Sequence, residues 1–362
     1  MKWYKSSGNQ GDIVLSTRVR LARNLSDVPF KSKMSREIKR NTVKKLYASI
    51  KNSDLAGDFS LVDLSNASQI KALSFAEKQY ISPEFAAESG AFLLSSKEDI
   101  SIMLCEEDHI RITAFEAGLN TDAAYKKADK VDNVFINNMK IAFDDKLGFL
   151  TASPMNLGTG LKVSVGLHLP ALKANHAIEG LTSMVGKLGL SLRKLYGEKG
   201  AFYLLSNQIS LGITEKSALD NITAVANQII KRERALRDVI KSSEQWEDIL
   251  YRSAGTLKMA RKLEFGEFLD LISNVRLGTA IGVFDMDMHS IGYLIHNSAD
   301  DFQRFCKKIT AYPLADRASA RYNIFCRNRE YGRNFRVIES DFRSVGAVGR
   351  RNLLWCRRLR ER

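Results

Sequence analysis

Apolar positions in the first two thirds of the chain often recur at every second residue, which is the spacing of half-buried β-strands. Segments with this alternation, or with an apolar run of strand length, lie at 12–25, 59–64, 91–94, 100–105, 110–115 and 190–212. The segments between 91 and 115 are separated by short polar turns, which predicts an antiparallel unit. This part of the chain is therefore expected to form an antiparallel sheet.

Helical spacing of apolar residues occupies the intervals between these segments. Ser35 and Thr214 are suited to N-cap helices, because a side-chain oxygen can accept a hydrogen bond from a free N–H of the first turn. Residues 122–139 and 176–188 also have helical spacing. After about residue 245 the pattern is almost wholly helical, with candidates at 246–259, 263–273, 291–309 and 315–328.

Together the patterns predict an α+β protein with three parts. Residues 1–244 are expected to form an antiparallel-sheet domain flanked by helices. Residues 245–345 are expected to form an all-helical domain, and 346–362 a basic, arginine-rich tail. The first boundary is placed near residues 242–244, where the long helix that follows Thr214 ends.

Residues 144–172 contain two apolar runs separated by a Gly-Thr-Gly turn, which predicts a strand–turn–strand unit. Gly158 and Gly160 permit positive φ, so backbone N–H groups there could converge on an anion, with Lys162 close by. A purely structural turn is the alternative, and this stretch by itself favours it.

Three arginines lie close together near the start of the chain. If the segment is extended, Arg18 and Arg20 point to the same side, because strand side chains alternate. Two guanidinium groups on one side suit a triphosphate, since each can bind oxygens in a bidentate manner. The alternative for this stretch is a basic edge strand.

An acidic cluster, Glu106-Glu107-Asp108, ends a predicted strand and is followed by His109 and Arg111. A solvated turn is the ordinary explanation of such a cluster. Carboxylates that orient a guanidinium, however, also need compensating positive charge nearby, and Arg111 supplies it. His109 and His168 stand beside apolar residues, so we expect both to be structural.

Four motifs in this order resemble the ATP:guanidino phosphotransferase family, to which arginine and creatine kinases belong. They are Ser16–Leu25, Glu106–Arg111, Arg193–Glu198 and Ser206–Gly212. The resemblance covers roughly residues 12–240 and is greatest to the bacterial protein arginine kinases. It implies a guanidino-kinase catalytic domain, and an assembly or dimerisation role for the helical domain at 245–345. It also implies transfer of the ATP γ-phosphate to arginine side chains of proteins, in protein quality control or a stress response.

The resemblance also implies roles for individual residues. It makes Glu107 and Glu198 the catalytic carboxylates. It assigns the nucleotide to six residues, namely Ser16, Arg18, Arg20, Arg111, Lys162 and Arg193. ATP and Mg²⁺ are the expected cofactors, with no metal held by protein residues alone. The expected partners are arginine-bearing protein substrates, a zinc-binding activator protein, Clp-type protease machinery and a second copy of the chain.

At three positions the chain departs from the family pattern. Lys162 stands where the family has a nucleotide-binding arginine, and lysine keeps the charge but loses the bidentate fork. Ser153 stands where the family has a cysteine, and a serine hydroxyl carries no charge at neutral pH. Gln79 stands where the family has a histidine. The substitutions at 153 and 162 predict weakened catalysis.

The composition is that of a globular protein of 362 residues with a net charge of +14. The four cysteines are scattered, without zinc-site spacing, and neither a signal peptide nor a membrane-spanning run is recognisable, so a cytoplasmic location is expected. Residues 317–362 hold thirteen arginines and no lysine. This segment is explained as a solvated basic face, as an anion-binding surface, or as a substrate for the chain's own kinase activity.

Three other functions remain open. A catalytically weak or inactive homologue could act as an adaptor through its helical, arginine-rich second half. Nucleic-acid binding by the basic tail would give a steep salt dependence, but it is not expected without an accompanying aromatic-rich motif. A kinase for a free guanidine metabolite is least expected, because the arginine motif begins near residue 16, without the helical domain that precedes it in such enzymes.

Overall fold

The computed structural model describes residues 2–6, 8–88, 90–260, 262–288 and 290–292, together with three short strands beyond residue 322. Its centre is an eight-stranded sheet in which all neighbouring strands are antiparallel. In spatial order the strands are β2 (Phe59–Asp63), β3 (Ala91–Ser95), β4 (Ile100–Leu104), β5 (Ile110–Ala117), β1 (Val14–Arg23), β8 (Leu161–His168), β10 (Phe202–Asn207) and β9 (Leu190–Lys194). The predicted antiparallel α+β architecture is confirmed.

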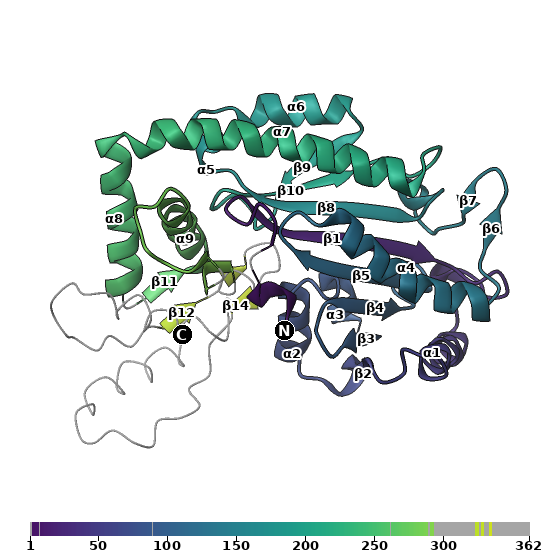
Figure 1. The fold of residues 1–362 in the computed structure, drawn as a ribbon. Helices are drawn as coiled ribbons and strands as arrows, with labels where there is room; N and C mark the ends of the chain where they lie inside the picture. Colours follow the sequence, from purple (N-terminus) through teal and green to yellow (C-terminus); the bar gives the residue numbers. More distant parts are fainter. Residues whose placement is uncertain are drawn as a thin grey trace, which may run out of the picture.

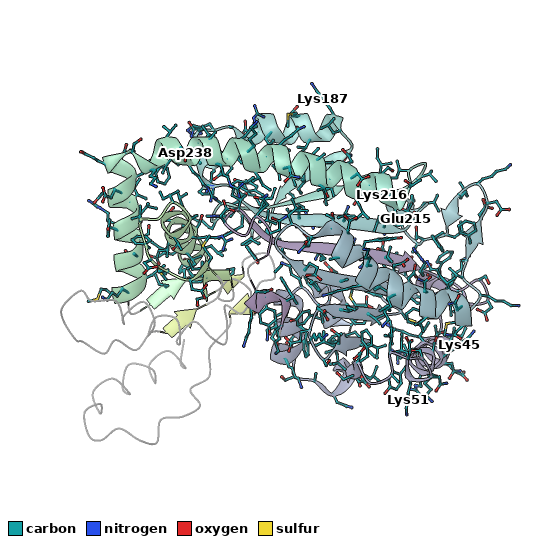
Figure 2. All side chains as sticks on the ribbon, in the orientation of Figure 1. Lys45, Lys51, Lys187, Glu215, Lys216 and Asp238 are labelled. Atoms are coloured by element: carbon teal, nitrogen blue, oxygen red, sulfur yellow. The ribbon has the colours of Figure 1, made fainter. Side chains whose placement is uncertain are left out.

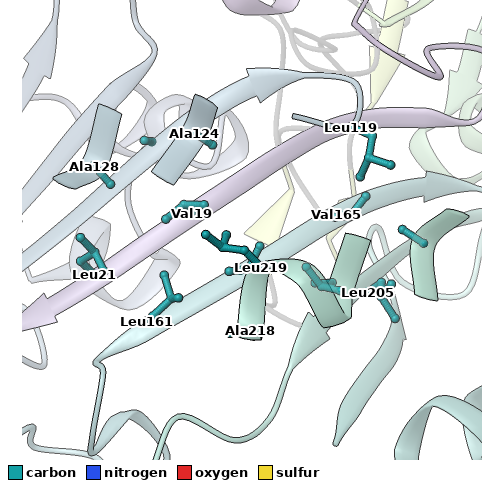
Figure 3. Packing of buried hydrophobic residues seen from close by; sticks show 14 of the residues in the cluster. Val19, Leu21, Leu119, Ala124, Ala128, Leu161, Val165, Leu205, Ala218 and Leu219 are labelled. Atoms are coloured by element: carbon teal, nitrogen blue, oxygen red, sulfur yellow. The ribbon is translucent and has the colours of Figure 1, made fainter. Parts of the chain in front are cut away.

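Helices cover one face of this sheet and enclose the main core (Figure 1). They are α1 (Arg36–Lys51), α4 (Thr121–Asn138), α6 (Ile178–Lys187) and α7 (Glu215–Lys241). In Figure 3, Val19 on β1 faces Ala124 and Ala128 of α4, and Ala218 of α7 and Leu205 of β10 belong to the same cluster. Charged side chains such as Lys187 and Asp238 project from the outer sides of α6 and α7 (Figure 2). The alternation of apolar residues thus buries one side of each central strand.

The helix starts confirm the predicted caps. The Ser35 side chain accepts a hydrogen bond from the N–H of Ile38 at the start of α1. Thr214 forms a capping box with Ser217 at the start of α7. These bonds satisfy donors that would otherwise have no partner within the helix.

Among the described residues, the helices that cover the second face of the sheet pack at its two ends. At one end α2 (Gln69–Glu77) and α3 (Pro83–Ala87) pack on Phe92 and Phe115. At the other end α8 (Glu244–Met259) and α9 (Phe265–Ala280) pack on Phe202 of β10. The middle of this face carries polar side chains, and it is the face that the candidate site occupies.

The stretch 144–172 differs from the prediction. Its first apolar run forms no strand of the main sheet, but a separate hairpin of β6 (Phe143–Asp144) and β7 (Gly148–Phe149). Only the second run enters the sheet, as β8, because β1 and β10 already supply both of its neighbours. Short helices complete this region: α5 (Pro170–Ala174) and the 3₁₀ turn Pro154–Asn156.

In the second half of the chain, α8 and α9 are joined by β11 (Lys262–Glu264), and the described residues 290–292 are also helical. The expected helix over 315–328 is wrong at Asn323–Phe325, which forms β12 and pairs in parallel with β11. Local periodicity does not reveal this pairing with a distant strand. The hairpin of β13 (Arg327–Asn328) and β14 (Arg333–Asn334) is also present. The rest of 315–328, most of 291–309 and the tail 346–362 lie outside the described residues.

None of the helices in the described part of the chain is long and apolar enough to cross a membrane.

Candidate active site

Strand register brings the predicted cations onto one face of the sheet. Arg20 on β1 lies opposite Lys162 on β8, and Ala22 lies opposite Arg111 on β5. The register of β1, β8, β10 and β9 also places Arg18 and Arg193 on this face. Residues directly opposite in antiparallel strands project to the same side. Five cations from four strands therefore share this face, which is hereafter called the cationic face.

The cationic face has an excess of positive charge. Burial, and then the charges of Arg20, Arg193 and Arg18, lower the pKa of Lys162 to about 8. Burial likewise lowers the pKa of Arg18, and the neighbouring guanidinium groups of Arg193 and Arg111 lower it further. Such mutual repulsion destabilises the protein without a ligand and would be relieved by a polyanion.

The acidic cluster is organised around Arg111. One amino group of Arg111 donates to buried Glu106 at 2.5 Å, and the other donates to Glu107 at 3.0 Å. Burial acts to raise the pKa of Glu106, but Arg111, the Glu107 N–H and the hydroxyl of Ser82 outweigh it, so this pKa is lowered. The side chain of Glu107 is 43% exposed. Glu106 thus neutralises Arg111, while Glu107 remains accessible at the edge of the cationic face.

Asp108 and His109, by contrast, hold the surrounding backbone. Asp108 accepts hydrogen bonds from Asn24 and from the N–H of Ala152, so it ties the segment before Ser153 to the acidic turn. His109 accepts a hydrogen bond from the N–H of Leu25 and lies 3.0 Å from the carbonyl oxygen of Pro29. His168 is also buried and contacts Ser273. Both histidines have the structural role that was predicted.

The Gly158–Gly160 turn is packed rather than open. The N–H of Thr159 donates to the carbonyl oxygen of Ser210. A Cβ atom at Gly158 would lie 2.4 Å from that same oxygen, and φ at Gly158 is +105°. Glycine is therefore needed for close approach of two backbone segments. These contacts favour the structural explanation of the turn over an anion-binding one.

Two residues that were given no role lie beside the arginines. Arg18 donates to the side-chain oxygen of Gln79 at 3.3 Å. Gln79 has a left-handed backbone with φ of +61°, which is uncommon for a residue with a side chain. Tyr196 lies near Arg18 and bonds to Gln79, although burial raises the pKa of its hydroxyl to about 12. The only sequence signal for Gln79 was its departure from the family pattern.

Glu198 lies apart from the acidic cluster. It is 83% exposed and pairs with Lys194, which points away from the face that carries Arg193 because the two residues are adjacent in β9. The catalytic assignment of Glu198 stays a prediction, and in this conformation the residue does not contact Arg111 or Glu106.

A cavity of about 340 Å³ opens beside Ser16, at the end of the cationic face remote from Glu107. Aromatic and small side chains make most of its wall, and Gln79 and Tyr196 lie where it meets the cationic face. Helix α9 contributes Arg276, Thr279 and Ala280. The site thus has an apolar chamber at one end, cations along its middle and a carboxylate at the other end.

Comparison with known proteins gives two family matches. Residues 39–236 match the ATP:guanido phosphotransferase C-terminal catalytic domain, and residues 243–298 match the protein-arginine kinase McsB C-terminal domain. A protein-arginine kinase from Clostridium acetobutylicum is 38% identical over 306 residues, which are 82% of this chain and 90% of the relative. One from Caldanaerobacter subterraneus is 36% identical over 293 residues, covering 78% of this chain and 87% of the relative.

Solved structures share the fold at lower identity. The duplicated taurocyamine kinase from Schistosoma mansoni, with bound transition-state analogue components, superposes with a TM-score of 0.58 at 23% identity. That match covers 69% of this chain and 39% of the duplicated protein. Lombricine kinase superposes with a TM-score of 0.55 at 21% identity, covering 64% of this chain and 68% of that structure.

Proposed function

The chain belongs to the ATP:guanido phosphotransferase family, and from that premise we propose that it is a protein arginine kinase. It would transfer the γ-phosphate of ATP to the guanidinium of arginine side chains in proteins. The observation that carries this proposal is the cationic face, which has two features. Its positive charges are crowded, since burial and neighbouring arginines lower the pKa of Lys162, and it ends at the accessible carboxylate of Glu107. A triphosphate matches the first feature and a guanidinium matches the second.

In this proposal the phosphates of ATP lie along the cationic face. Arg18, Arg20, Lys162 and Arg193 bind them, and Ser16 marks the end toward the nucleoside. The cavity beside Ser16 has a volume typical of a small-molecule pocket and receives the base and ribose. This orientation places the γ-phosphate at the opposite end, next to Arg111 and Glu107.

The reaction then requires in-line attack on the γ-phosphorus. A guanidinium nitrogen forms the new N–P bond while the P–O bond to the β-phosphate breaks and ADP leaves. Glu107 holds the guanidinium by charge and hydrogen bonding and accepts the proton that this nitrogen loses. The cations stabilise charge on the transferring group. Arg111 is fixed beside Glu107 by its bond to Glu106, so both groups are in place before the substrate arrives.

Mg²⁺ would reach this site on the nucleotide. Within the described ranges there is no cluster of three or more His, Cys, Asp or Glu side chains that could hold a metal ion. Mg²⁺ typically retains several waters and binds substrate phosphates with few protein ligands. When bound, it would neutralise phosphate charge, while the residues of this chain orient the two substrates.

The test is transfer of labelled γ-phosphate from Mg-ATP to an arginine-rich protein, with free arginine as the control substrate. We expect acid-labile label on the protein and little on free arginine. Label on free arginine alone would contradict the protein-substrate proposal. Bound ATP without any transfer would favour the adaptor alternative. Five expectations stay predictions. The resemblance implies the zinc-binding activator, the Clp-type machinery, the homodimer and the stress role, whereas the cytoplasmic location is expected from the cysteine pattern and the lack of a recognisable signal peptide or membrane-spanning run.

The lysine at position 162 leads to a pH prediction. With the pKa of Lys162 at about 8, the free protein loses this charge as the pH rises above 8, whereas bound phosphate favours the charged form. ATP affinity should therefore fall above pH 8, by up to about tenfold per pH unit for one linked proton. In Lys162→Arg the fall should shift to higher pH and binding at pH 9 should be tighter, as measured by titration calorimetry. An identical profile for Lys162→Arg and the unmodified protein would contradict this assignment.

The lowered pKa of Lys162 also affects folding stability, which should rise with pH where ATP affinity falls. Because the folded pKa of Lys162 is below its ordinary value of 10.5, the unfolded chain binds the extra proton between about pH 8 and 10.5. In the absence of ATP this group therefore makes the protein more stable as the pH rises through that range.

A further inference from the structure

Helix α9, in the second half of the chain, contacts the residues that precede β1. Arg276 is only 2% exposed, and one of its amino groups donates to the carbonyl oxygen of Gly11 at 2.6 Å. Gly11 lies three residues before β1, the strand that carries Ser16, Arg18 and Arg20. A side chain from the helical part thus holds the backbone that leads into the cationic face.

Two further arginines, both from α7, hold the same turn. Arg234 donates to both carboxylate oxygens of Asp12, at 2.9 and 2.6 Å. Arg237 donates to the carbonyl oxygen of Asp12 at 3.2 Å, and its own charge is balanced by buried Glu233 at 2.8 Å. The turn is therefore well fixed without Arg276, which leaves a different role open for that residue.

Arg276 differs from these two because it has no carboxylate partner among the described residues. Its buried Nε–H also makes no hydrogen bond there. Burial, and then the charge of Arg237, lower the pKa of Arg276 to about 9. An unsatisfied buried donor on a cation is costly unless a ligand completes it.

The position of Arg276 indicates which ligand that is. The side chain lines the same 340 Å³ cavity as Ser16, Gln79 and Tyr196. Aromatic rings also line this cavity, among them Trp3 and Phe115, which stack with centroids 5.3 Å apart. A flat heteroaromatic base beside rings, with ring or ribose acceptors toward an N–H donor, fits this combination.

We propose that Arg276 of α9 binds the nucleoside part of ATP, so that the helical part of the chain completes the nucleotide site. This inference rests on the proposed ATP-binding function. The unpaired Nε–H of Arg276 donates to an acceptor of the base or ribose, and Thr279 and Ala280 on the next turn form the wall beside it. The nucleotide therefore bridges the sheet domain and α9.

The experiment compares the binding of ATP with that of inorganic tripolyphosphate, which has the phosphates but no nucleoside. We expect Arg276→Met to lower ATP affinity by about tenfold or more, because one hydrogen bond to a charged group is lost. Tripolyphosphate should bind Arg276→Met and the unmodified protein alike. Arg252→Met is the matched control, because Arg252 lies on α8 with its side chain 78% exposed and should leave both ligands unaffected.

Ala280→Leu is a second variant, which fills the cavity while keeping Arg276. It should also weaken the binding of ATP but not that of tripolyphosphate. Equal losses of both ligands in Arg276→Met would mean that Arg276 acts only by holding Gly11, and would overturn the proposal. Unchanged ATP affinity in both variants would overturn it as well. If the unmodified protein binds ATP as expected but transfers no phosphate to arginine, the proposed kinase function fails while the contact with Arg276 stands.

Discussion

Replacing Glu107 with glutamine is expected to reduce phosphoryl transfer to protein arginine by about 10²- to 10⁴-fold, the range typical of a lost general base. The amide has nearly the shape of the carboxylate, but it cannot neutralise a guanidinium or accept its proton at neutral pH. ATP binding should change little, because Arg111 keeps its stronger partner, Glu106, at 2.5 Å. Steady-state kinetics would therefore show a loss in kcat with a similar KM for ATP.

Glu116→Gln provides the matched control for this experiment. Glu116 lies on β5, as Arg111 does, but it projects to the opposite face and pairs with Lys127 at 2.7 Å. The same chemical change there should leave transfer nearly unaltered. If Glu107→Gln retained the activity of the Glu116→Gln control, Glu107 could not be the group that accepts the proton.

Arg20 and Arg23 lie three residues apart on β1, and replacing each with methionine is expected to affect different properties: ATP binding for Arg20 and stability for Arg23. Arg23→Met should lower the free energy of unfolding by about 3–5 kcal/mol, the usual result of removing one partner of a buried ion pair. Arg23 is 3% exposed, donates to Asp132 at 2.7 Å and stacks over Phe149 with its guanidinium carbon 3.5 Å from the ring centroid. Asp132 would be left buried without its counter-charge.

Arg20→Met should instead lower ATP affinity by about tenfold or more, as expected for a lost charge-assisted phosphate contact. Stability should be unchanged or higher without ATP. Burial and the charges of Arg111 and Arg18 lower the pKa of Arg20, so its charged form is already disfavoured in the free protein. Urea denaturation and ATP titration of both variants would separate the two roles. Loss of stability in Arg20→Met but not in Arg23→Met would contradict the assignment of faces.

Much of the site was predictable because its parts are local. Arg18 and Arg20 share a side of an extended strand whatever the rest of the chain does. Glu106, Glu107 and Arg111 are separated by one short turn, so their proximity also follows from the chain itself. Helix caps at Ser35 and Thr214 depend on the first turn alone, and both are present.

Other features depended on contacts between distant segments. The run at 144–150 has strand-like composition, yet it forms a separate hairpin, because β1 and β10 already occupy the two edges of β8. The sequence left anion binding open at Gly158 although it favoured a structural turn, and only the close approach of Gly158 to Ser210 shows that the turn is packed. Gln79 and Tyr196 acquire a place in the site only when α2 and the β9–β10 loop are brought to Arg18.

The sequence by itself therefore determined most strands and the longer helices of the sheet domain, the alternation that separates its two faces, and the family to which the chain belongs. The tertiary structure decided that Lys162 lies opposite Arg20, that Glu198 lies apart from Glu107, and that Arg276 reaches the cavity beside Ser16 from α9. The physical reason is that the direction of a side chain follows from local backbone geometry. Strand register and helix docking instead depend on packing between residues far apart in the chain.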